Sequence, residues 1–267
     1  MIVAMLTPLS NASYVNIIQP FNTTIRTQNT TVHLGKDGPG QTFYITISAA
    51  TTNSTGALNS LGWNRFAVSG LPQGWIAQNS SLYNPTLSVK ITPASYAQNG
   101  TYSFNLTAIN IGNYSKLGAL RFSATVNITP DVFILGVKPA TVSSGAGLPQ
   151  NIYVTINNTG VSDSLFSIGL SGMPGRNITN TVIALHNTSR TYTYPIEVSE
   201  PGRYVINIDV RSISSPMRVF KETNVTFIAL ANLPSDYSAI GSGIDAFPIV
   251  YEPLYAIMYL ISKLFTH

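Results

Sequence analysis

The sequence contains no cysteine and few charged residues. The absence of Cys among 267 residues excludes disulfides, thiolate catalysis and Cys-ligated zinc. Charged residues make up 9% of the chain, against about 25% in a typical soluble protein. The formal net charge is +4, but no run of Lys or Arg is present, so the basic stripe that binds a nucleic-acid backbone is missing. We therefore expect no nucleic-acid partner and a fold that depends on packing and backbone pairing.

The sequence also lacks recognisable catalytic and metal-binding motifs. His33, His186 and His267 lie far apart in the chain, and none has a second His or an acid at ligand spacing. No nucleophile elbow and no phosphate-binding glycine loop occurs. A carboxylate pair brought together by folding stays open as an alternative. These absences predict a non-catalytic protein without metal or cofactor.

Uncharged polar residues take the place of the missing charges. Asn, Ser, Thr and Gln together account for 86 of the 267 residues. The apolar fraction of 44%, with 14 Tyr and 11 Phe, can supply a hydrophobic core and argues against general disorder. The scarcity of carboxylates, whose protonation destabilises many folds in acid, also predicts tolerance of low pH.

Asn-x-Ser/Thr triplets are unusually frequent. Composition alone would give about five of them, and this triplet is the acceptor signal for N-glycosylation. The thirteen acceptors are Asn11, Asn22, Asn29, Asn53, Asn79, Asn99, Asn105, Asn113, Asn127, Asn157, Asn177, Asn187 and Asn224.

Several of these sequons lie on the polar side of alternating segments. In Tyr102 to Ala108, Asn105 and Thr107 alternate with apolar residues, so both halves of the sequon point to one face of a strand. Asn127 and Asn224 lie in segments of the same pattern. The pattern predicts outward-facing glycan acceptors, although Asn and Thr that simply face water on half-buried strands would produce it too.

Period-two alternation dominates from residue 14 to residue 230, and turn residues recur about every 8 to 12 positions, as in β-sandwiches. The segment 41–47 repeats at 150–156, and Gly100 to Leu106 repeats 102 residues later as Gly202 to Ile208. The turn Ser69-Gly70-Leu71-Pro72 likewise repeats at residues 171–174. We therefore predict an all-β chain of two tandem Ig-like or fibronectin-type-III-like sandwiches with antiparallel strands.

The expected boundaries follow from this repeat. Residues 13–130 form the first domain and residues 131–230 the second, with the join at Thr129-Pro130-Asp131. Residues 1–12 resemble the end of a signal peptide, and residues 231–267 contain a linker and a short apolar helix.

The turn and strand motifs carry a family resemblance. Ser69 to Trp75, followed by Leu87 to Pro93 and Asn99 to Tyr102, resembles the Ig-like modules associated with alpha-galactosidases and with microbial cell-adhesion-related domains. The second half repeats the pattern without the Trp, so the resemblance covers about residues 38–230. It implies a non-catalytic module of exported surface proteins, often archaeal or bacterial, and it carries over no functional residues.

Two further groups of residues are candidate binding sites. Trp63, with nearby Tyr83, could form an aromatic platform on which a sugar ring packs, whereas a core position is the more common role for a Trp. The expected C-terminal helix has an apolar stripe that a membrane interface, a partner subunit or the chain's own sandwich could cover. The stripe consists of Leu254, Ile257, Met258, Ile261, Leu264 and Phe265.

Together these patterns predict an exported, N-glycosylated protein of the cell surface or envelope, with a structural or interaction role. Its expected partners are other envelope proteins or copies of itself, and its C-terminus would attach it to membrane or partner. One alternative is a carbohydrate-binding accessory module that uses Trp63 and Tyr83. Another is a filament or surface-layer subunit in which Tyr14 to Pro20 adds a strand to the next copy.

Overall fold

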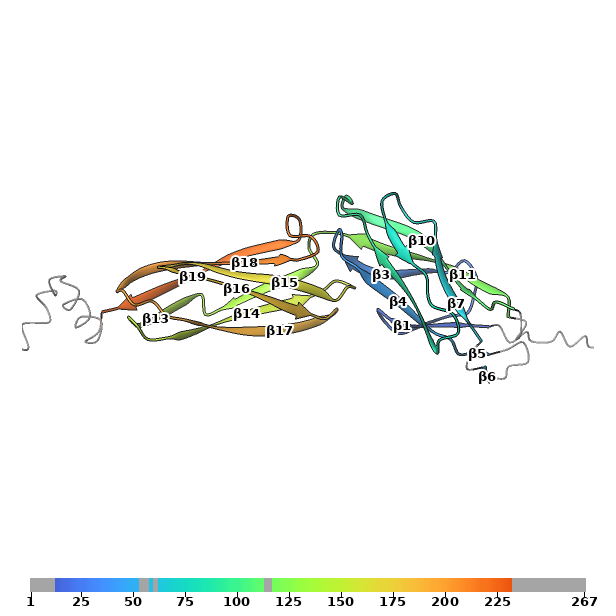
Figure 1. Cartoon of the computed structure of the whole chain (residues 1–267), viewed down its shortest axis with the longest axis horizontal. Helices are drawn as coiled ribbons and strands as arrows, with labels where there is room; N and C mark the ends of the chain where they lie inside the picture. Colours follow the sequence, from blue (N-terminus) through green and yellow to red (C-terminus); the bar gives the residue numbers. More distant parts are fainter. Residues whose placement is uncertain (1–12, 53–57, 60–61, 113–116, 232–267) are drawn as a thin grey trace, which may run out of the picture.

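The computed structural model describes residues 13–52, 58–59, 62–112 and 117–231, and every regular element in these residues is a β-strand. The strands form two sandwiches that lie end to end (Figure 1). The expected C-terminal helix and its apolar stripe, the N-terminal residues 1–12, and the sequons at Asn11, Asn53 and Asn113 lie outside the described residues.

The first domain packs a five-stranded sheet, ordered β2-β1-β4-β9-β8, against a four-stranded sheet, ordered β3-β11-β10-β7. A small β5-β6 pair is attached to it. Its strands are β1 (Val15–Gln19), β2 (Thr23–Ile25), β3 (Thr31–Asp37), β4 (Phe43–Ser48), β5 (Thr51–Thr52), β6 (Leu58–Asn59), β7 (Arg65–Ser69), β8 (Ile76–Gln78), β9 (Thr86–Thr92), β10 (Gly100–Ile109) and β11 (Ala119–Ile128).

The second domain packs a three-stranded sheet, ordered β12-β14-β17, against a five-stranded sheet, ordered β13-β19-β18-β15-β16. Its strands are β12 (Phe133–Lys138), β13 (Thr141–Gly145), β14 (Gln150–Asn158), β15 (Ser164–Met173), β16 (Arg176–Ala184), β17 (Thr188–Ile196), β18 (Gly202–Ser212) and β19 (Phe220–Leu230).

Alternation places one face of each sheet in a core. In β10, Phe104 and Leu106 are buried while Asn105 between them is exposed. Each domain has its own buried cluster, rich in Phe and Ile, and Val161 of the second domain packs against the cluster of the first. Because burying such a side chain contributes about 1.5–3 kcal/mol, each cluster can stabilise a domain without disulfides. The prediction of an all-β chain with two sandwich domains is confirmed.

The strand pairing differs from the antiparallel prediction in one respect. β3 pairs with β11, and β13 pairs with β19, in parallel. In both domains the parallel partner is the last strand of the domain, because an early segment crosses from one sheet to the other. The repeat is also imperfect, since β8 joins the sheet of β4 and β9 whereas β16 joins the opposite sheet beside β15.

Candidate functional site

The two domains are joined by backbone contacts as well as by the short connection between β11 and β12. The end of β3 contacts the loop that precedes β15, where Lys36 and Gly160 form a parallel bridge. The Val161 amide donates a hydrogen bond to the Lys36 carbonyl, at 2.9 Å. Within the first domain, at the start of the connection to the second, the Thr129 amide donates to the Asp37 carbonyl, also at 2.9 Å. These bonds fix the second domain against the end of β3, so we take this joint as the candidate functional site.

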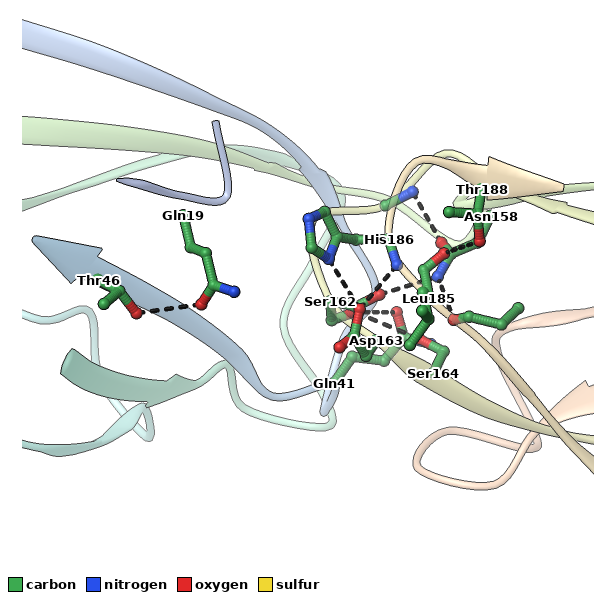
Figure 2. A network of polar contacts seen from close by, with 12 residues as sticks. Gln19, Gln41, Thr46, Asn158, Ser162, Asp163, Ser164, Leu185, His186 and Thr188 are labelled. Atoms are coloured by element: carbon green, nitrogen blue, oxygen red, sulfur yellow. Dashed lines mark hydrogen bonds and ion pairs between the residues drawn. The ribbon is translucent and has the colours of Figure 1, made fainter. Parts of the chain in front are cut away.

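A buried polar network fills the joint. Ser162 of the second domain donates its hydroxyl to Asp37 Oδ1 at 2.7 Å. Gln41 bridges the domains, since its Nε2 atom donates to Ser212 Oγ at 2.9 Å while its Oε1 atom accepts from the Gly38 amide. Figure 2 shows Gln41, Ser162 and Ser164 gathered where the strands of the two domains meet. Asp37, Gln41, Ser162 and Ser212 are at most 1% exposed, so the network excludes bulk water.

The carboxyl group of Asp37 is incompletely satisfied. Its Oδ2 atom is buried and has no hydrogen-bond partner among the described residues. Burial raises the pKa of this carboxyl well above its ordinary value, although hydrogen bonds from Ser162 and from the Gly38 backbone act in the opposite direction. The joint therefore contains an acid that favours its neutral form.

Asn158 shapes the loop that carries Ser162. Its Nδ2 atom donates to the carbonyls of Ser162 and Ala184, each at 2.9 Å, and its Oδ1 atom accepts from the Gly160 amide. Asn158 is 1% exposed, so these bonds replace the water that the side chain loses. The loop is thereby held in the conformation that aims Ser162 at Asp37.

An exposed pair flanks the network. Asp163 accepts hydrogen bonds from the backbone and the ring of His186, at 2.7 and 2.8 Å (Figure 2). Together with Gln19 and Tyr44 of the first domain, these side chains line a small cleft of about 30 Å³. The cleft is large enough for a water molecule and much smaller than a typical ligand pocket.

On another part of the joint, Arg218 reaches from the second domain to the first. Its guanidinium donates to the Ala97 carbonyl at 2.7 Å and to the Ser95 carbonyl at 3.5 Å. The joint therefore has two separate groups of contacts, which resist bending more effectively than one would.

The described residues contain no group of three or more His, Cys, Asp or Glu side chains that could hold a metal ion. They also contain no helix long and apolar enough to cross a membrane. The joint therefore has a structural role, because its contacts set the orientation of one domain relative to the other.

Ten of the thirteen sequon asparagines lie in the described residues, and all ten have accessible side chains. Nine are exposed and one, Asn157, is half-buried. No hydrogen bond among the described residues is donated by the Nδ2 atom of any of them.

The buried asparagines form a separate set. Asn64, Asn110 and Asn158 are at most 8% exposed, and each donates its Nδ2 hydrogens to backbone carbonyls. None of the three is followed by a Ser or Thr two positions later. Asparagines that stabilise the interior are therefore distinct from those in acceptor triplets.

The interpretation of Trp63 as a sugar-stacking residue is wrong. Its ring is 0% exposed, and its Nε1 atom donates to the Tyr14 carbonyl at 2.9 Å. The nearby Tyr83 is 55% exposed and has a φ of 60°, but it has no exposed Trp beside it. The other Trp, Trp75, also belongs to the core, because it is 8% exposed and packs on Tyr102.

The structure argues against the alternative of a filament or surface-layer subunit that adds a strand to the next copy. β1, which was expected to pair with a neighbouring copy, lies between β2 and β4 of its own sheet. Val15 and Ile17 on this strand are at most 1% exposed. Releasing β1 would therefore open the core of the first domain.

Sequence reasoning missed the joint residues, because Asp37 and Ser162 lie in no recognised motif and are 125 positions apart. One weak signal was present: Gln41 begins the repeated segment 41–47, and Asn158 ends the strand that contains the second copy. An alignment of the two copies marks both positions as strand boundaries but does not show that they face each other.

Comparisons with known proteins add to the description of the fold. No family model matches the chain, and no curated protein matches it. Among solved structures, a chimeric titin Ig tandem carrying an exogenous decorin peptide is 14% identical over 83% of this chain and 98% of its own, with a TM-score of 0.38. A Caenorhabditis elegans member of the MSP family is 15% identical over 36% of this chain and 96% of its own, with a TM-score of 0.25. A β-glucosidase from Listeria innocua is 16% identical over 38% of this chain and 16% of its own, with a TM-score of 0.26. These likenesses concern the fold alone.

Proposed function

We propose that the chain is a non-catalytic, exported and N-glycosylated protein of the cell surface or envelope. Its two Ig-like domains act as a stiff structural or interaction module. Its apolar C-terminal residues, which lie outside the described ranges, attach it to membrane or to a partner. The expected partners are other envelope proteins or further copies of the chain.

The observation that carries this proposal is the separation of the asparagines into two sets. Every described sequon Asn is exposed or half-buried, whereas the three buried Asn side chains stand outside acceptor triplets. Outward-facing acceptors require this separation, because an amide that is hydrogen-bonded in the interior could not carry a sugar. Glycans on these positions would also hydrate a surface that carries few ions.

The joint supports a structural role. Two groups of interdomain hydrogen bonds limit the motion expected of domains that share only a linker. A module of this kind can hold a distal surface at a fixed distance from its attachment point. No constellation of nucleophile, base and oxyanion donors was found among the described residues that would support an enzymatic role instead.

Surface labelling of intact cells of the native host tests the export step. We expect the protein to react with a membrane-impermeant amine reagent in intact cells, with a cytosolic protein of similar lysine content as the unlabelled control. Labelling of this chain only after lysis would contradict the proposal.

A further inference from the structure

The outer face of each domain has a polar hollow at the same place in the fold. In the first domain the hollow has a volume of about 390 Å³ and is lined by Asn29, Ser69, Asn105, Thr107, Arg121 and Ser123. In the second domain it has a volume of about 490 Å³ and is lined by Ser171, Asn207, Asp209, Arg211, Glu222 and Asn224. Both hollows lie on the face of the sheet that points away from the core.

Strand register shows that the two hollows are equivalent. Asn105 on β10 pairs with Ser69 on β7 and with Ser123 on β11. Asn207 on β18, which is 102 positions later, pairs with Ser171 on β15 and with Asn224 on β19. The same row of three strands therefore presents amide and hydroxyl groups in both domains.

A small residue lies beside this row in both domains. In the second domain Gly169 pairs with Asp209, and the three atoms nearest to a Cβ built on Gly169 all belong to Asp209, at 3.8–4.0 Å. The equivalent residue of the first domain is Ala67, which pairs with Thr107. Neither position therefore adds bulk next to the row of hydroxyl and amide groups.

Glycan acceptors line both hollows: Asn29 and Asn105 in the first domain and Asn224 in the second. In the first domain Ser123 Oγ donates to Asn105 Oδ1 at 3.0 Å, which fixes the amide and leaves its Nδ2 atom without a partner in the described part of the chain. In the second domain the central Asn207 is not followed by Ser or Thr at the required position, but Asn224 beside it on the same row is an acceptor. The acceptor of the second domain therefore lies one strand away from the position that corresponds to Asn105, and it still lines the hollow.

The linings suit carbohydrate. Sugar hydroxyls both donate and accept hydrogen bonds, and the hollows offer hydroxyl, amide and guanidinium groups that do the same. In the second domain Arg211 is held by Asp209 at 2.7 Å and by Glu222 at 3.0 Å, so the charged groups are already oriented. An attached sugar starts within reach of these groups and does not bear the entropic cost of association.

We propose that each hollow seats the first sugars of the N-linked glycan on its own acceptor, Asn105 in the first domain and Asn224 in the second. This inference rests on the proposed function, because it requires that the chain be glycosylated. It goes further in assigning these two glycans to built sites on the protein, whereas glycans on acceptors that line neither hollow extend into solvent.

Asn127 and Asn187 supply matched controls. Asn127 is exposed on β11, on the same face of the same sheet as the hollow of the first domain, but it pairs with Thr101 and is not among the residues that line that hollow. Asn187 is exposed in the turn between β16 and β17, at a φ of 52°. Glycans at these two positions have no comparable protein surface around them.

Timed periodate oxidation of the native glycoprotein, followed by quantification of each glycopeptide, tests the inference. Periodate cleaves vicinal diols only when they are free. A sugar that lies in a hollow and gains about two hydrogen bonds from the protein should be oxidised about tenfold more slowly. We therefore expect slower oxidation at Asn105 and Asn224 than at Asn127 and Asn187. In denaturant, oxidation should proceed at the same rate at all four sites. That result would show that the slower oxidation at Asn105 and Asn224 is caused by the folded protein and not by the sugar composition.

Equal oxidation rates at the four sites of the folded protein would overturn the proposal that the hollows bind the sugars. They would leave the proposed function unaffected. The same holds if Asn105 and Asn224 carry no sugar while other sequons do. Absence of sugar from every sequon would overturn both.

Discussion

Replacing Asp37 by Asn is expected to raise the free energy of unfolding near neutral pH by about 1 kcal/mol or more, because an uncharged amide avoids the cost of burying or protonating an unpaired carboxylate. Most such substitutions in a core destabilise a protein. Here the amide keeps the oxygen that accepts from Ser162 and removes a charge that the joint cannot neutralise. The variant should also make stability less dependent on pH.

No cation compensates the Asp37 carboxylate. The ion pairs among the described residues join Asp163 to His186, Arg211 to Asp209 and Glu222, and Lys221 to Asp131. The neighbouring Lys36 is exposed, and Arg218 donates to backbone carbonyls of the first domain. Asp37 therefore depends on hydrogen bonds alone.

The direction of the pH effect follows from the raised pKa of Asp37. Between the ordinary pKa of an Asp, about 3.9, and the raised value, the folded protein retains a proton that the unfolded chain has released. The contribution of Asp37 to the free energy of unfolding is therefore most favourable below the ordinary pKa and is lost as pH rises through the folded pKa. This trend supports the acid tolerance that the scarcity of carboxylates predicts.

Thermal unfolding of wild type and Asp37→Asn between about pH 3.5 and pH 8 tests this prediction, because the slope of stability against pH counts the protons bound. The control is Asp131→Asn. Lys221 lowers the pKa of the exposed Asp131, so its contribution is present at neutral pH and lost as pH falls, opposite in sign to that of Asp37. A neutral-pH loss of stability in Asp37→Asn would show that the joint tolerates the charge.

Replacing Gly172 by Ala is expected to destabilise the second domain by about 2–5 kcal/mol, whereas the same change at its repeat equivalent Gly70 should cost about 1–2 kcal/mol. Both glycines have positive φ, 93° and 66°. A Cβ at Gly172 would lie 2.2 Å from the Val205 carbonyl oxygen, which the sheet holds in place. At Gly70 the nearest atom is the side-chain Nδ2 of Asn105, at 3.3 Å, so the new methyl group would meet an exposed side chain at a longer distance and not a backbone atom.

Urea unfolding can separate the two domains, because both Trp residues, Trp63 and Trp75, lie in the first. Tryptophan fluorescence reports on the first domain and far-ultraviolet circular dichroism reports on both. Gly172→Ala should lower the urea midpoint seen by circular dichroism and leave the fluorescence midpoint nearly unchanged. Equal losses in the two alanine variants would contradict the difference in contacts.

Alternation predicted which side chains of a strand face the core, and the long strands show why. In β11 every second residue is buried, as is every second residue of β10 from Phe104 to Ala108, and the sequence contains that period directly. Alternation does not reveal which strand is the neighbour. β8 and β16 occupy opposite sheets at corresponding points of the repeat, and the parallel partners of β11 and β19 lie far away in sequence.

The candidate site was less predictable, because its residues have ordinary roles in other contexts. Asp37 ends a strand and precedes a turn, where an exposed Asp is common, and only contact with Ser162 buries it. Trp63 lies beside a polar loop, which indicated exposure, whereas the Tyr14 carbonyl accepts its hydrogen bond inside the domain. Such contacts between distant segments leave no local pattern.

Site-by-site glycopeptide mapping of protein from the native host tests the central claim most directly. The account predicts sugar on the exposed sequon asparagines, including Asn105, Asn127 and Asn224, and an intact mass above the 28.7 kDa of the polypeptide. A polypeptide whose acceptors are all unmodified would contradict it.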